Sequence, residues 1–171
     1  MPTEPAARLL LWLALLTAPA AQALPTDRDQ PIEVTADQAV QEGNVVTYTG
    51  EVVIVQGSLR IDADKVVVHS DGHRIQRMVA TGNRARLQQL PEPDGELVKG
   101  RARTITYLQQ EELMVLEEEA EVEQEGSIVT GQRIDYEIDT EVVRAHSSGS
   151  GSDRVQMVLQ PEASRRDPGG D

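Results

Sequence analysis

Apolar and polar residues alternate in short segments along most of the chain. Segments rich in Val and Ile are separated by clusters that contain Gly, Asn, Asp or Pro, residues that favour turns. This pattern is typical of an all-β protein. We expect clear strands at 45–49, 51–56, 58–62, 65–69, 103–108, 133–138, 141–145 and 154–159, and weaker ones at 31–35, 75–80, 84–88 and 112–130.

One segment, residues 108–125, also fits a helix, because it is rich in Leu, Glu and Gln. Leu116 and Ala120 have helical spacing, but they share strand parity with Met114 and Val122. No capping residue opens the segment. We therefore predict a strand here.

A degenerate repeat runs through the chain, with inward-facing apolar residues on both sides of a small residue. Its clearest copy contains Leu59, Ile61, Ala63, Val66 and Val68. Each copy predicts a strand, a corner and a second strand, so that stacked copies form a continuous apolar wall. A parallel β-helix is the alternative fold for such a repeat. Three weaker copies begin at Ile32, Val98 and Ser127, with mismatches at Gln41, Gly100 and Ser127.

The N-terminus has the pattern of a secretory signal. Arg8 precedes an apolar stretch, and the small residues Ala21 and Ala23 mark a cleavage site. The remaining length suits a single domain, and the polar C-terminal end lacks core-forming residues. The predicted organisation is a signal peptide at 1–23, one domain at 24–160 and a disordered tail at 161–171.

Composition narrows the function further. The net charge of −13 disfavours nucleic acids and anionic membrane surfaces as partners, and the absence of Cys excludes thiolate metal sites and thiol catalysis. After the signal, the aromatic residues are Tyr48, Tyr107 and Tyr136, too few for a typical sugar-stacking surface. An aliphatic wall suits an acyl chain, but the same residues also fill an ordinary β core.

Two groups of polar residues are candidates for chemistry. His69 and His73 flank a turn, a spacing that does not direct both rings at one metal, so we expect neither a metal site nor a cofactor. Asp62 and Asp64 could act as paired carboxylates on a polysaccharide, but they lie at the corner of the repeat, where Asp is a common turn residue. Three hypotheses follow: a lipid carrier, a polysaccharide-acting β-helix enzyme and a structural envelope adaptor.

Several motifs resemble one known family. The stretches at 43–50 (GNVVTYTG) and 61–68 (IDADKVVV) are the most specific, supported by 30–32, 131–136 and 154–161. Through them, residues 30 to 160 are similar to the OstA-like family of periplasmic lipopolysaccharide transport proteins. The resemblance implies an open, twisted β-jellyroll of stacked antiparallel strands. It also implies a non-enzymatic carrier that moves lipopolysaccharide (LPS) from the inner to the outer membrane and so contributes to outer-membrane assembly.

The same resemblance implies partners and binding residues. The partners are LPS through its lipid A, an LptC-like inner-membrane protein, an LptD-like outer-membrane protein, and further copies added head to tail by strand addition. Glu117–Glu119 departs from relatives, which commonly have Gly in this stretch. The family's ligand-facing positions correspond to Ile32, Val34, Tyr48, Leu87, Tyr107 and Leu116, repeat parity adds Ile61, Val122, Ile134 and Tyr136, and the expected edge-strand docking residues are Ile32, Val34, Val155 and Val158.

Overall fold

The computed structural model describes residues 27–160 except 73, 92–94 and 150–153. Its strands form one antiparallel sheet in which sequence neighbours are mostly spatial neighbours, in the order β1-β3-β4-β5-β6-β7-β8-β10, with β2 beside β3 and β9 beside β8. The strands are β1 (Ile32–Thr35), β2 (Gln38–Glu42), β3 (Val45–Gln56), β4 (Leu59–Asp71), β5 (Arg74–Gln89), β6 (Val98–Leu108), β7 (Leu113–Gln124), β8 (Ser127–Glu137), β9 (Val142–His146) and β10 (Gln156–Val158), with short 3₁₀ turns η1 (Asp27–Asp29) and η2 (Gln109–Glu111).

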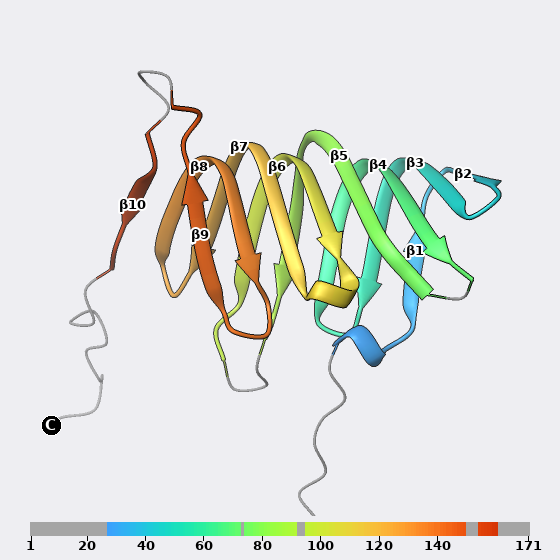
Figure 1. The fold of residues 1–171 in the computed structure, drawn as a ribbon, viewed down its shortest axis with the longest axis horizontal. Coiled ribbons are helices and arrows are strands. Elements are labelled where there is room, and N and C mark those ends of the chain that lie inside the picture. The colour runs from blue at the N-terminus through green and yellow to red at the C-terminus, as the bar shows by residue number, and fades with distance from the viewer. Residues whose placement is uncertain (1–26, 73, 92–94, 150–153, 161–171) are drawn as a thin grey trace, which may run out of the picture.

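The sheet bends along a line that crosses its long strands, so one sheet makes two facing layers. The strands arch over at the top of Figure 1, and the pairing registers of β3 to β7 shift there. We call this line the corner and the opposite, turn-bearing side the mouth. Layer one contains β2, β9 and residues 45–49, 65–71, 74–81, 104–108, 113–117 and 133–137; layer two contains β1, β10 and residues 52–56, 59–62, 85–89, 98–101, 120–124 and 127–131.

Unusual backbone conformations produce the corner. Gly50 has a φ of 83°, a value that glycine adopts without steric cost. Glu118 and Glu119 have φ values of 64° and 58° at the corresponding point of β7. The carboxylate of Asp64 stabilises the bend of β5 by accepting a hydrogen bond from Asn83 N–H at 2.9 Å. These residues bend the strands without ending them.

Each end of the sheet has an edge made of two short strands. At the N-terminal edge, β1 and β2 pair with different halves of β3, and at the C-terminal edge β9 and β10 pair with different halves of β8. The break between β1 and β2 lies at the corner, where Asp37 N–H donates to Gly50 O at 3.1 Å. Each layer therefore presents one strand at each edge.

The fold confirms the all-β class and the antiparallel jellyroll, and it overturns the parallel β-helix alternative, because all the strand pairs described are antiparallel. Residues 113–124 are a strand as predicted, preceded by the 3₁₀ turn η2. Several predicted pairs of strands are single strands that continue through the corner. β2 was not predicted, because all five of its residues are exposed and lack an apolar face. The predicted signal peptide and tail lie outside the described residues.

Candidate functional site

The inner faces of the two layers carry apolar rows that cross the strands. In layer two, a row of register partners runs from Val34 in β1 to Met157 in β10. In layer one, a row runs from Tyr48 in β3 to Ala145 in β9. Between these ends lie Ile54, Ile61, Leu87, Gly100, Val122 and Val129 in layer two, and Val66, Ala80, Ile105, Leu116 and Ile134 in layer one.

The two rows are packed against each other. A Cβ atom at Gly100, in layer two, would lie 2.9 Å from Leu116 Cδ2, in layer one, and 2.9 Å from Leu87 Cγ. The side chains of Ile61, Leu116 and Ile134 are at most 1% exposed. The interior is therefore a closed, aliphatic core, and any guest between the layers requires them to separate.

The predicted binding residues fall on a small number of these rows. Four of them, Val34, Ile61, Leu87 and Val122, share the central row of layer two. Tyr48, Leu116 and Ile134 share the central row of layer one. Tyr107 and Tyr136 lie on the next row towards the mouth, each in register with Met114, and Ile32 pairs with Gln56 at the mouth of layer two.

The mouth differs from the deeper interior because it contains buried polar groups. Gln56 and Gln89 are 1% and 4% exposed, and Tyr136 is fully buried. These glutamines were not identified from the sequence, although their inward strand parity could have indicated them. Residues from both layers line a depression of about 780 Å³ at the mouth: Asp29, Gln30, Ile32, Gln56, Arg74, Ile75, Gln109 and Gln110.

The N-terminal turn η1 is attached to this polar end of layer two. The Asp27 carboxylate accepts hydrogen bonds from Ser58 N–H at 2.7 Å, Ser58 Oγ at 2.6 Å and Gln89 Nε2 at 3.0 Å. Gln56 Nε2 donates to Gln30 O at 3.1 Å. The segment therefore organises the side chains of both buried glutamines.

At the opposite end of the mouth, a hydrogen bond joins layer two to layer one. Gln124, at the end of β7 in layer two, donates from Nε2 to Glu141 Oε2 at 3.1 Å, and Glu141 belongs to the turn after β8 in layer one. This hydrogen bond joins the two layers across the mouth. Burial, the larger cause, and the charge of Glu141 together raise the pKa of the nearby Tyr136 to about 12. The tyrosine is therefore protonated at neutral pH.

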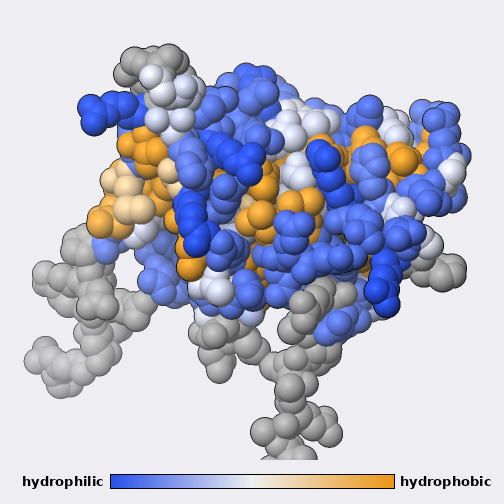
Figure 2. Space-filling view, in the orientation of Figure 1, coloured by the Kyte–Doolittle hydropathy of each residue, from blue (hydrophilic) through white to orange (hydrophobic). Residues whose placement is uncertain are grey.

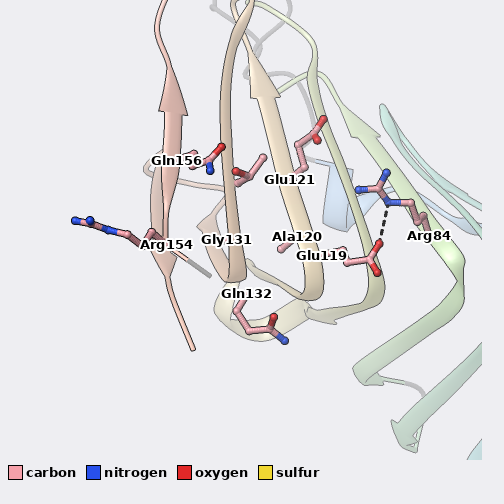
Figure 3. Close-up of a pocket in the computed structure, with 9 residues that line it drawn as sticks. Arg84, Glu119, Ala120, Glu121, Gly131, Gln132, Arg154 and Gln156 are labelled. Carbon is pink, nitrogen blue, oxygen red and sulfur yellow. Dashed lines mark ion pairs between the residues drawn. The ribbon is translucent and has the colours of Figure 1, made fainter. Parts of the chain in front are cut away.

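The outer side of the corner has a polar depression of about 250 Å³ (Figure 3). Its rim includes an ion pair between Arg84 Nε and Glu119 Oε2 at 3.7 Å. Arg103 donates to the same carboxylate at 2.6 Å and lowers the Glu119 pKa through this hydrogen bond and its charge. The surrounding residues are Arg84, Glu119, Ala120, Glu121, Thr130, Gly131, Gln132, Arg154 and Gln156, a set that offers no continuous apolar wall for an acyl chain.

The other candidate groups have structural roles. Asp62 forms an ion pair with Arg60 at 2.5 Å, and Asp64 stabilises the corner, so neither carboxylate is poised for acid–base work. His69 is exposed, and its predicted companion His73 lies outside the described residues. Within the part of the chain that the structure describes, no group of three His, Cys, Asp or Glu could hold a metal ion. No helix in that part could cross a membrane.

Exposed apolar side chains gather at the two edges of the sheet. Met157 and Val158 of β10 are 58% and 55% exposed, and Val40 of β2 is 46% exposed. On the face seen in Figure 2, hydrophobic residues form a broken band from the β10 side to the β2 side. Val155, predicted within an edge strand, precedes β10 and is 40% exposed. Both edges therefore offer apolar contacts beside unpaired backbone groups.

Comparison with known proteins decides the family. The family model described as "LptA/(LptD N-terminal domain) LPS transport protein" matches residues 32–142, which span both layers of the sheet. The chain belongs to this family. It is 35% identical over 158 residues to the lipopolysaccharide export system protein LptH of Pseudomonas aeruginosa, covering 87% of this chain and 90% of that protein.

Other members and a solved structure agree with this assignment. The chain is 34% identical to the lipopolysaccharide export system protein LptA of Escherichia coli K12 over 163 residues, 90% of this chain and 86% of that protein. The crystal structure of LptH, described as the periplasmic component of the lipopolysaccharide transport device of P. aeruginosa, superposes with a TM-score of 0.75. The two sequences are 33% identical, and the superposition covers 80% of this chain and 100% of the LptH chain.

Membership of the LptA family settles the class of function. The chain is a component of the lipopolysaccharide transport system, and the family consists of transport proteins rather than enzymes. The hypothesis of a polysaccharide-acting enzyme is therefore wrong. The structural roles of Asp62 and Asp64 agree with this outcome.

Proposed function

We propose that the chain, after removal of residues 1–23, carries lipopolysaccharide through the periplasm with the acyl chains held between layers one and two. The observation that carries the proposal is the pair of apolar rows that continue from edge to edge of the sheet. Burying an acyl chain contributes about 0.8 kcal/mol per methylene. The cost of separating the packed layers offsets part of this free energy.

The two edges are the proposed docking surfaces. An LptC-like protein, an LptD-like protein or a second copy adds a strand to β1 and β2 or to β9 and β10. Ile32, Val34 and Val158 supply apolar contacts in this docking, with Val155 beside them. Because every long strand spans both layers, a copy added at an edge extends both inner faces together.

Photo-crosslinking in cells tests the proposal. A crosslinker at Leu87 or Tyr107 faces the interior, whereas one at Gln88, the exposed neighbour of Leu87, faces outwards and is the matched control. We expect lipopolysaccharide adducts at the first two positions and none at Gln88. Absence of adducts at both inward positions contradicts the proposal.

The closed packing of the interior supports a second candidate, a structural adaptor that joins envelope proteins through its edges and binds no lipid. Native mass spectrometry of the purified protein with lipid A separates the two candidates. A complex with lipid A supports the carrier. Its absence, combined with retained edge assembly, supports the adaptor.

A further inference from the structure

The interior contains one hydroxyl group whose burial is not explained by the fold. Tyr136 has no exposed surface, and its Oη has no hydrogen-bond partner among the described residues. A buried and unpaired donor destabilises a protein, because it has lost its hydrogen bonds to water without replacing them. A phenylalanine would fill the same volume without this cost.

The surroundings of Tyr136 are apolar on its own sheet face. Its register partners are Met114 in β7 and Val143 in β9, and the next inward residue of β8 is Ile134, deeper in the interior. The charge of Glu141 raises the pKa of Tyr136, but no hydrogen bond joins the two side chains. The Glu141 carboxylate instead accepts a hydrogen bond from Gln124. The hydroxyl therefore lies at the boundary between the aliphatic interior and the polar mouth.

This position matches the chemistry of an acylated ligand. An acyl chain is apolar along its length and begins with a carbonyl oxygen, which accepts hydrogen bonds. A chain that enters from the mouth with its tail in the aliphatic interior has its carbonyl near the mouth. Tyr136 stays protonated and uncharged at neutral pH. Its hydroxyl can therefore donate a hydrogen bond to such an oxygen.

We propose that the Tyr136 hydroxyl donates a hydrogen bond to the carbonyl oxygen that begins a bound acyl chain, and thereby sets how deeply the chain enters. The inference rests on the proposed function and makes Tyr136 a specificity-determining residue for ester- or amide-linked chains. The cost of the unpaired hydroxyl in the empty protein is removed when ligand is bound.

Two variants and two matched probes test the inference. Tyr136→Phe removes the buried inward hydroxyl, and Thr106→Val, the control, removes a buried hydroxyl that lies on the outward parity of β6, between Ile105 and Tyr107. Dodecyl maltoside and maltose monolaurate carry the same chain length and sugar, but the first has a glycosidic link without a carbonyl group and the second has an ester link. Binding of each probe below its micelle concentration, and of lipid A, is measured by calorimetry.

We expect Tyr136→Phe to weaken maltose monolaurate binding by about tenfold and to leave dodecyl maltoside binding unchanged, whereas Thr106→Val preserves the preference for the ester. The melting temperature of empty Tyr136→Phe protein should rise by about 3 °C.

A fall in melting temperature means that the hydroxyl is already paired, and overturns the inference. Equal affinity of wild type and Tyr136→Phe for the ester and for lipid A overturns it too, but leaves the proposed function intact. A wild-type protein that binds neither probe nor lipid A overturns both.

Discussion

Gly100 illustrates what a single residue contributes to the two-layer fold. The repeat places an apolar side chain at this position, and the sequence therefore presents Gly100 as a mismatch. In the structure, Leu87 from its own layer and Leu116 from the facing layer occupy the space of the missing side chain. The exception could not be interpreted from the sequence, because one of the two residues that fill this space comes from the facing layer.

Glu118 is a strained residue at the corner. It is exposed and has a φ of 64°, in the left-handed region that disfavours residues with a Cβ. We predict that Glu118→Gly raises the free energy of unfolding by about 0.5 kcal/mol. Glu123→Gly, in the same strand but with no positive φ, should lower it by about 1 kcal/mol. Urea denaturation measures both, and a loss of stability in Glu118→Gly contradicts the assignment of strain.

Glu137 gives the fold a dependence on acid pH. Hydrogen bonds from Arg144, the larger cause, and from Thr140 lower its pKa below the usual 4.5. The folded state thus binds this proton less readily than the unfolded state, and the stabilisation is present above pH 4.5 and is lost as the pH falls through the folded-state value. NMR titration should give a midpoint below 4.5 that rises in Arg144→Ala. An unchanged midpoint in that variant contradicts the prediction.

At the scale of elements, the sequence located strands better than it located their ends. The predicted strands 58–62 and 65–69 are one strand, β4, because Ala63 and Asp64 bend the chain without interrupting it. Local residue types signal a corner, but only pairing with β3 and β5 shows that the strand continues. β2 gives no periodic signal, since it pairs through its backbone and buries none of its side chains.

The C-terminal edge strand should control assembly. Val158 is 55% exposed and pairs on one side only, with Ile128. We predict that Val158→Asp reduces self-association, because it adds a negative charge to an acidic chain and removes an apolar contact. Leu97→Asp, at a 38% exposed residue before β6 and away from both edges, is the control. Light scattering should show smaller oligomers for Val158→Asp alone, and an unchanged distribution contradicts the docking role of β10.

For the whole molecule, the proposed lipid binding and the packing of the core would use the same inner faces of the two layers. Inward positions were predictable from strand parity and resemblance, but their closed packing was not, since it depends on how two distant halves of each strand meet. We predict that spin labels at Ser58 and Gln109, on turns of opposite layers, move apart when lipid A binds. Labels at Gln109 and Asp139, both in layer one, keep their distance. Unchanged spacing for the first pair contradicts entry between the layers.

The continuity of the strands through the corner has a further consequence for movement. Neighbouring strands lie about 4.8 Å apart, and each of the long strands β3 to β8 adds one residue to the central row of each layer. In the proposed function, a guest that slides across the strands therefore meets mostly aliphatic neighbours. Apart from the hydrogen bond proposed for Tyr136, these contacts would hold a guest by its sides and leave its position along the row weakly specified.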